Sequence, residues 1–243
     1  MRTQVSAVAE RVYRLGTRWE NFHLVGDADG WTLIDAGYPG YLGQLTETLA
    51  ALGSSADAVA AVVVTHHHVD HMGCAAALQQ RRGTPVFVGV ADAPIVAGER
   101  RSHVPPGFYR QSWRPSMMAY LAHTVRVGGA QYRPVPEVRE IKGEQVLDAP
   151  GRPRIVPTPG HTAGHLSAIL DSCGVLFAGD ALVNFDYASG RRGIALHRFN
   201  EDRERARSSL QVPRDLEADV VVFGHGDPWN GSPREAVDQA LGG

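Results

Sequence analysis

The chain has 243 residues, a formal net charge of −2 at pH 7, and 43% hydrophobic against 21% charged residues. This near-neutral charge, with Lys142 as the one lysine, lacks the basic excess that neutralises a nucleic-acid backbone. No apolar segment is long enough to cross a bilayer, and the two cysteines are too few for a disulfide framework. We therefore expect one cytoplasmic domain over residues 1–243 that acts on a small molecule, with neither nucleic acid nor a membrane as partner.

The N-terminal part of the chain predicts an antiparallel start followed by alternating helices and strands. Strands are expected at residues 12–15, 21–25, 31–34, 59–64 and 85–88. Asp-Ala-Asp-Gly at 27–30 is typical of a hairpin turn. Apolar residues at helical spacing predict a helix at 41–52 that ends at Gly53, and a second helix is expected at 73–82, ending at Gly83. The β-branched run 59–64 indicates a strand that is buried on both faces.

Residues 92–136 interrupt this alternation. The segment is rich in proline around an expected helix at 116–127, and we predict that it is an insertion that acts as a lid. Its large apolar side chains would line a pocket or pack on a second subunit of a homodimer; they are Phe108, Tyr109, Trp113, Met117, Met118 and Tyr120. Beyond it, strands are expected at 155–157, 166–170, 175–178 and 220–223, and helices at 201–211 and 234–241.

Four apolar runs each have a histidine or an aspartate just beyond their C-terminal end. The residues that follow them are His66, His68, Asp70 and His71 after the first run, then His161, Asp180 and His225. Open α/β sheets bind ligands beyond the carboxyl ends of their strands, so one shared site explains all four runs. Imidazole nitrogen and carboxylate oxygen suit Zn²⁺, Fe or Mn²⁺, and a cluster without cysteine argues against a structural thiolate zinc site.

The spacing inside the first group is consistent with a metal site. In an extended segment, residues two apart project to the same side, so His66, His68 and Asp70 can converge while His67 points away. His71 needs a turn, which Gly73 helps to permit. Seven candidate ligands exceed what one tetrahedral ion requires, whereas two ions bridged by an aspartate would use all seven.

These residues resemble the metallo-β-lactamase superfamily, whose signature His-x-His-x-Asp-His is present from His66 to His71. The resemblance extends from Leu-Ile-Asp-Ala-Gly at 33–37 through Thr-Pro-Gly-His-Thr at 158–162 to Gly-His-Gly at 224–226. It implies an α/β fold, the four-layer αββα sandwich, with two metals at one edge between the sheets. It also implies the ligand sets: His66, His68 and His161 for one ion, Asp70, His71 and His225 for the other, and Asp180 as the bridge.

The resemblance is to the glyoxalase II, lactonase and related hydrolase branches. The bridging Asp180 favours these branches, because the lactamases of the family lack a bridging aspartate there. The tyrosine that lactonases place three residues later is Val183 in this chain, with Tyr187 nearby but out of register. We therefore keep ester, lactone and thioester substrates open.

The sequence predicts a hydrolase that uses two divalent metal ions, with zinc expected and iron or manganese as alternatives. A hydroxide between the ions would attack a carbonyl group, and Asp70 would be catalytic, orienting the hydroxide and carrying its proton to the leaving group. Two other functions stay open. One is an oxidoreductase resembling the mononuclear-iron sulfur dioxygenases of the superfamily, and the other is a non-catalytic metal-binding module.

Overall fold

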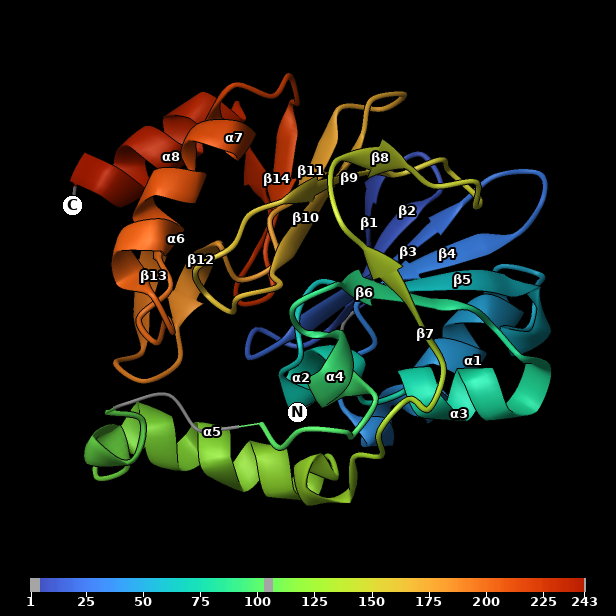
Figure 1. The fold of residues 1–243 in the computed structure, drawn as a ribbon, viewed down its shortest axis with the longest axis horizontal. Helices are drawn as coiled ribbons and strands as arrows, with labels where there is room; N and C mark the ends of the chain where they lie inside the picture. Colours follow the sequence, from blue (N-terminus) through green and yellow to red (C-terminus); the bar gives the residue numbers. More distant parts are fainter. Residues whose placement is uncertain (1–4, 103–106, 243) are drawn as a thin grey trace.

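The computed structural model describes residues 5–102 and 107–242. Two β-sheets lie face to face, with helices on their outer sides (Figure 1). The strands are β1 (Ser6–Ala9), β2 (Val12–Gly16), β3 (Asn21–Gly26), β4 (Trp31–Ile34), β5 (Val59–Val64), β6 (Val86–Gly89), β7 (Val138–Ile141), β8 (Gln145–Val146), β9 (Arg154–Pro157), β10 (Leu166–Leu170), β11 (Val175–Phe177), β12 (Leu182–Asp186), β13 (Arg191–Leu196), β14 (Val220–Val222) and β15 (Trp229–Asn230).

The helices are short, and several have a single turn. The α-helices are α1 (Leu42–Ala51), α2 (Val69–Met72), α3 (Ala75–Arg82), α4 (Ala93–Val96), α5 (Pro115–Arg126), α6 (Arg203–Ser209), α7 (Gln211–Arg214) and α8 (Pro233–Gly242). Four 3₁₀ turns accompany them in the described residues: Pro39–Tyr41, Ala56–Ala58, Tyr109–Gln111 and Gly129–Gln131. In the part of the chain that the structure describes, no helix has the length and apolar character that a membrane span needs.

The first sheet has seven strands in the order β1 to β7. The strands β1 to β4 are antiparallel neighbours, and β4 to β7 run parallel. Val63 of β5 pairs with Ile34 on one side and Phe87 on the other. The expected strand at 59–64 therefore lies inside the sheet, with five of its six residues buried, as its apolar sequence predicted.

The second sheet has the order β15, β14, β11, β10, β9, β8, and β12 pairs with β13 as a separate two-stranded ribbon. Side chains from both sheets interdigitate between them, including Ile34, Val63, Ile155 and Phe177. The outer face of the first sheet packs on α1 and α3, and the outer face of the second packs on α6 and α8. The expected four-layer αββα sandwich is confirmed.

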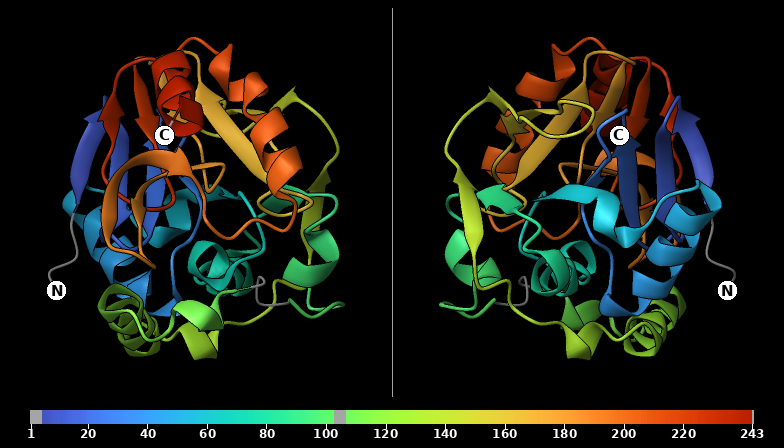
Figure 2. Two further views of the ribbon diagram at one scale, coloured as in Figure 1. Left: turned by 90° about the vertical axis from the view of Figure 1, so that its left-hand side faces the viewer. Right: turned by 90° about the vertical axis from the view of Figure 1, so that its right-hand side faces the viewer.

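The segment 92–136 lies at one end of the sandwich. Its main helix, α5, runs below both sheets, on the side of the molecule opposite α8 (Figure 2). Met117 and Tyr120 of α5 are buried against Trp19, Phe185 and other aromatic side chains, whereas Trp113 and Met118 are exposed. Residues 103–106 of this segment lie outside the described residues. The large apolar side chains of 92–136 thus divide between the interior and the surface.

Candidate metal centre

The seven side chains predicted as metal ligands meet at one edge of the sandwich. They stand on the turn after β5 (His66, His68), on α2 (Asp70, His71), and in the loops that follow β9, β11 and β14 (His161, Asp180, His225). The first sheet supplies four of them and the second sheet three. Six are buried, and His68 is half-buried. The strand-end pattern therefore predicted that these residues lie together, and the family resemblance predicted that the site lies between the two sheets.

One group of donors consists of three imidazoles and a carboxylate. His68 Nδ1 lies 3.0 Å from His66 Nε2 and 3.1 Å from His161 Nε2. Asp180 Oδ2 lies 3.4 Å from His161 Nε2 and 3.9 Å from His66 Nε2. A tetrahedral zinc ion with Zn–N bonds of about 2.0–2.1 Å separates its ligands by about 3.3 Å. The spacing of these four donors therefore fits one such ion.

A second group adjoins the first and shares its carboxylate. Asp70 Oδ2 lies 3.8 Å from His71 Nε2 and 3.7 Å from His225 Nε2. Asp180 contacts this group with both oxygens, Oδ1 at 3.6 Å from His71 Nε2 and Oδ2 at 3.0 Å from His225 Nε2. One carboxylate that touches donors of both groups has the position that a bridge between two ions requires.

The local conformation around Asp70 differs from the predicted one. Asp70 lies on the single-turn helix α2, not on an extended segment, so it joins His71 in the second group instead of converging with His66 and His68. The prediction for His67 was correct, because its ring turns away and its Nδ1 lies 3.2 Å from Asp92 Oδ2.

Gly73 permits the turn of α2 through close packing. Its φ of −58° is one that any residue adopts. A Cβ at Gly73 would lie only 2.4–2.5 Å from backbone atoms of Gly37, Tyr38 and Pro39. The prediction for Gly73 was therefore correct, and the physical reason is that the turn leaves no space for a Cβ at this position.

Hydrogen bonds around the centre fix which nitrogen of two imidazoles faces inward. His71 Nδ1 donates to Asp35 Oδ2 at 2.8 Å, and His66 Nδ1 lies 3.0 Å from the hydroxyl of Thr65, which itself donates to Asp35 at 2.9 Å. In the neutral form of each ring, Nε2 is therefore the nitrogen that carries the lone pair, and it points into the centre. The Asp35 carboxylate thus orients two of the predicted ligands, His71 directly and His66 through the Thr65 hydroxyl.

The other two Nε2 donors are fixed in the same way. His161 Nδ1 lies 3.3 Å from the side-chain oxygen of Asn200, and His225 Nδ1 donates to the backbone carbonyl of Trp19. His71 Nε2 and Asp180 Oδ1 are buried with no hydrogen-bond partner among the described residues. Buried polar atoms that point toward one another without hydrogen-bond partners are typical of a metal site that holds no ion. The donor residues of the centre therefore fit a bound metal ion.

Burial sets the protonation of the first group. It lowers the pKa of His66 and His161 well below the usual histidine value, and it lowers the pKa of His68 to about 3. Burial alone would raise the pKa of Asp180, but the surrounding imidazoles, His225 first, hold it well below its usual range. The group therefore offers neutral nitrogen lone pairs and an ionised carboxylate at neutral pH, which are the forms that bind a divalent cation.

The second group is more basic. Burial lowers the pKa of His71, but three carboxylates, Asp35 the strongest, outweigh it and raise that pKa to about 10. The same balance, with Asp180 dominant, raises the pKa of His225 to about 8. A cation that enters this group must displace protons, because imidazole binds metal in its neutral form.

His197 is a residue that the sequence analysis did not place in the site. It follows β13 directly, and its Nε2 lies 3.6 Å from Asp180 Oδ2, in a third group with His225. Its ring packs 4.4 Å from that of His161. The signal that identified the other candidate ligands, an apolar run with a histidine or an aspartate just beyond it, is also present in Ile194-Ala195-Leu196 before His197.

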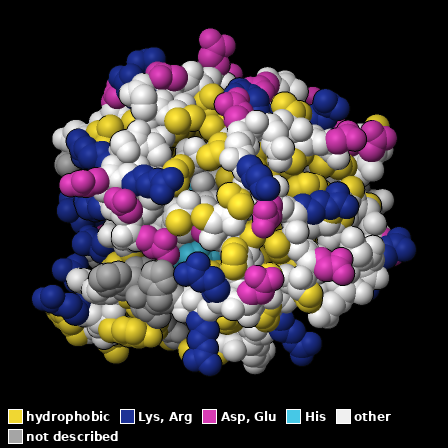
Figure 3. Space-filling view, in the orientation of Figure 1, with side chains coloured by type: hydrophobic (Ala, Val, Ile, Leu, Met, Phe, Trp, Pro, Cys, Tyr) yellow, Lys and Arg dark blue, Asp and Glu magenta, His cyan; other side chains and the backbone are white. Residues whose placement is uncertain are grey.

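An apolar cavity of about 280 Å³ opens beside the two groups. Tyr120 and Tyr187 stack in its wall with ring centroids 4.1 Å apart, and Tyr187 lies 4.9 Å from the ring of His225. The Tyr120 hydroxyl donates to Asp70 Oδ2 at 3.1 Å, which ties α5 to the centre. Phe108 and Tyr109 also line the cavity, so part of segment 92–136 covers the site. Only a small area of histidine is visible on this face of the molecule (Figure 3).

The chain is similar in sequence and in structure to proteins of one superfamily. The profile described as "Metallo-beta-lactamase superfamily" matches residues 19–225. The probable metallo-hydrolase YflN of Bacillus subtilis (strain 168) is 26% identical over 239 residues, covering 92% of this chain and 86% of YflN. A hydroxyacylglutathione hydrolase of Halorhodospira halophila (strain DSM 244 / SL1) is 31% identical, covering 69% of this chain and 47% of that protein. The crystal structure of TTHA1429, a metallo-beta-lactamase family protein from Thermus thermophilus, matches with a TM-score of 0.69 at 26% identity, covering 96% and 78% of the two chains.

Proposed function

Because this chain belongs to the metallo-β-lactamase superfamily, we propose that it is a hydrolase that binds two divalent ions, expected to be zinc, and cleaves a small ester, lactone or thioester. One observation carries the proposal. The Asp180 carboxylate lies between two groups of imidazole donors, with Oδ1 3.6 Å from His71 Nε2 and Oδ2 3.4 Å from His161 Nε2. Paired ions about 3.5–4 Å apart, held by such a shared carboxylate, are a recurrent hydrolytic arrangement.

The residues of the two groups have separate parts in this proposal. The first ion would be held by His66, His68 and His161, the second by Asp70, His71 and His225, and Asp180 would contact both. When bound, such ions lower the pKa of a water ligand towards neutrality and polarise a carbonyl oxygen. Asp70 lines the cavity, and the hydrogen bond from Tyr120 fixes its carboxylate there. In the proposed reaction, Asp70 would take a proton from the nucleophilic water and pass it to the leaving group.

The cavity beside the centre supports an uncharged, apolar acyl group. Apart from Asp70 and Asp180, its described lining holds no acidic or basic side chain other than the imidazoles of His68 and His225. Aromatic rings make up much of the remaining lining, and they bind apolar groups because the contact buries apolar surface. A relative named hydroxyacylglutathione hydrolase supports the inclusion of thioesters among the substrates.

The test measures metal content and hydrolysis on the same preparation. We expect two divalent ions per chain and turnover of at least one member of a panel of small esters, lactones and thioesters. Turnover should be lost in Asp70→Asn with the circular dichroism spectrum unchanged. The matched control is Asp148→Asn, which replaces a fully exposed aspartate and should keep full turnover.

Two results would overturn the proposal. A protein that holds two ions and cleaves no member of the panel would favour the non-catalytic metal-binding module. One iron per chain, with consumption of oxygen, would favour the oxidoreductase.

A further inference from the structure

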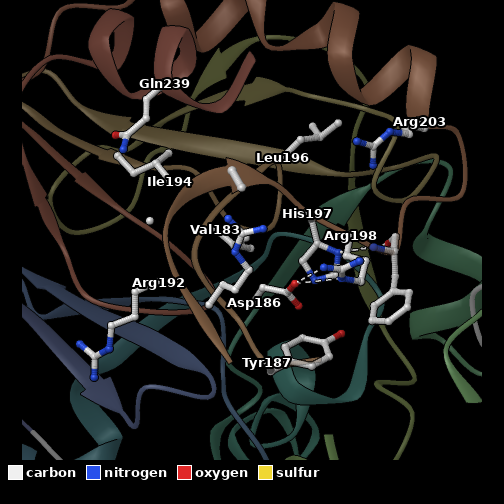
Figure 4. Close-up of a pocket in the computed structure, with 14 residues that line it drawn as sticks. Val183, Asp186, Tyr187, Arg192, Ile194, Leu196, His197, Arg198, Arg203 and Gln239 are labelled. Atoms are coloured by element: carbon white, nitrogen blue, oxygen red, sulfur yellow. Dashed lines mark hydrogen bonds and ion pairs between the residues drawn. The ribbon is translucent and has the colours of Figure 1, made fainter. Parts of the chain in front are cut away.

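A second cavity, of about 410 Å³, adjoins the metal centre through Tyr187 and His197. The ribbon β12–β13 and the loop after it form most of its wall, and α6 and α8 contribute one residue each (Figure 4). We call this cavity the arginine groove, because four arginines line it: Arg191, Arg192, Arg198 and Arg203. Asp186 is the one carboxylate in the described lining. A chain whose net charge is −2 thus concentrates positive charge beside its candidate active site.

Two of these guanidinium groups are not neutralised. Arg198 Nε donates to Asp186 Oδ2 at 2.9 Å, and Arg192 lies 3.4 Å from Asp227. Arg191 and Arg203 are exposed, and neither has a carboxylate within 4.0 Å among the described residues. A cleft lined by charges of one sign raises the local concentration of the opposite ion, so unpaired guanidinium groups in a concave site favour an anion.

The groove and the apolar cavity share part of their walls. Tyr187 and Phe199 line both of them, so the two cavities are neighbours. His197 is a shared wall, because it lines the groove while its Nε2 lies 3.6 Å from Asp180 Oδ2. The imidazole ring of His197 thus stands between the groove and Asp180.

Resting on the proposed function, we propose that the arginine groove binds an oxyanion, a phosphate or a carboxylate, on the leaving group of the substrate. The acyl group then occupies the apolar cavity, and the scissile carbonyl lies between the two. Guanidinium groups suit this role because their planar fork donates two parallel hydrogen bonds to one oxyanion. The substrate class is therefore an ester or thioester that joins an apolar acyl group to an anionic alcohol or thiol.

The experiment compares three butyryl thioesters of equal length on the metal-loaded enzyme: one with an uncharged amide end, one with a terminal phosphate and one with a terminal carboxylate. The readout is the ratio of kcat/KM for each anionic thioester to kcat/KM for the uncharged one. We expect a ratio of about ten or more for at least one anionic thioester, and we expect this ratio to arise from a lower KM. The identity of that anion separates phosphate from carboxylate as the natural group.

Two double variants test whether the arginine groove causes the preference for an anionic thioester. Arg191→Gln/Arg203→Gln should lower the ratio about tenfold, whereas Arg81→Gln/Arg205→Gln, which removes the same charge from exposed positions outside the groove, should leave it at the wild-type value. A ratio near one in the wild-type enzyme, or equal losses in both double variants, would overturn the groove proposal while hydrolysis itself upheld the proposed function.

A binding measurement keeps the inference testable without turnover. The S-methyl thioethers of the phosphate and carboxylate thiols cannot be hydrolysed, and calorimetry gives their affinity directly. We expect at least one to bind the wild type about tenfold more tightly than Arg191→Gln/Arg203→Gln. Equal affinity for the two proteins would refute the groove, even if no thioester were cleaved.

Discussion

Replacing Asp35 by asparagine tests whether the network behind the imidazoles prepares the centre for metal. Asp35 Oδ2 accepts hydrogen bonds from His71 Nδ1 at 2.8 Å and from the Thr65 hydroxyl at 2.9 Å, and Oδ1 accepts from the Thr65 backbone at 2.8 Å. In Asp35→Asn, either orientation of the amide puts an N–H group against one of these donors. Asparagine tolerates the left-handed φ of 59° at this position, so the perturbation stays local.

The expected loss of metal affinity follows from the hydrogen bond between Asp35 and His71, which holds the imidazole ring in its orientation. Loss of a carboxylate partner behind a ligating histidine costs about 10–100-fold in metal affinity, or about 1.4–2.7 kcal/mol. We expect this loss in a competition titration of Zn²⁺ against a chromogenic chelator, with the circular dichroism of the metal-free protein unchanged. Asp148→Asn is the control and should bind zinc like the wild type. If Asp35→Asn bound zinc within threefold of the wild type, Asp35 would not be orienting a ligand.

Three further predictions concern stability and turnover. Burial first, with the nearby Arg14, lowers the pKa of His23 to about 3. The unfolded chain takes up this proton first, so His23 contributes about 2 kcal/mol to the loss of stability between pH 7 and pH 5. Denaturant titrations should show the total loss in His23→Leu smaller than that of the wild type by this amount. In chelator-treated protein, Gly73→Ala should lower the free energy of unfolding by about 3 kcal/mol, because its Cβ would meet backbone atoms at 2.4–2.5 Å. Equal denaturant midpoints for the variant and the wild type would contradict this prediction. Tyr120→Phe removes the 3.1 Å hydrogen bond to Asp70 and should reduce kcat about tenfold on the best substrate of the panel, with metal content unchanged.

Much of the fold could be predicted because its strands carry local signals. The strands β4, β5 and β10 begin and end where the apolar runs predict, and α1 and α5 agree with the predicted helices to within one residue at each end. The prediction failed where the sequence is polar or the element very short. The strand β13 opens with Arg-Arg-Gly, which has no alternation of apolar and polar residues, and β12 was missed with it.

The candidate site shows the same limit. The convergence of the strand-end ligands followed from the apolar runs, but the helical turn that carries Asp70 did not. That turn is held by tertiary hydrogen bonds, from the Gly73 amide to the Gly37 carbonyl at 2.7 Å and from the Ala36 amide to the His71 carbonyl at 2.7 Å. The sequence of α2 contains no pattern that predicts these hydrogen bonds. His197 was missed for the related reason that β13, the strand which delivers it, was not recognised.

The division of the ligands between the two sheets has a consequence for engineering. The first sheet takes its seven strands from residues 6–141 and the second its six from residues 145–230, with the exposed Gly143 in the connection. Each half carries an incomplete ligand set, His66 to His71 in one and His161 to His225 in the other. A chain cut at Gly143 would yield two fragments that divalent cations can bring together, since a cation that binds only the assembled form stabilises it. If the centre binds zinc as proposed, such a pair would form a zinc-dependent split protein, in which reassembly of the two fragments reports on the metal.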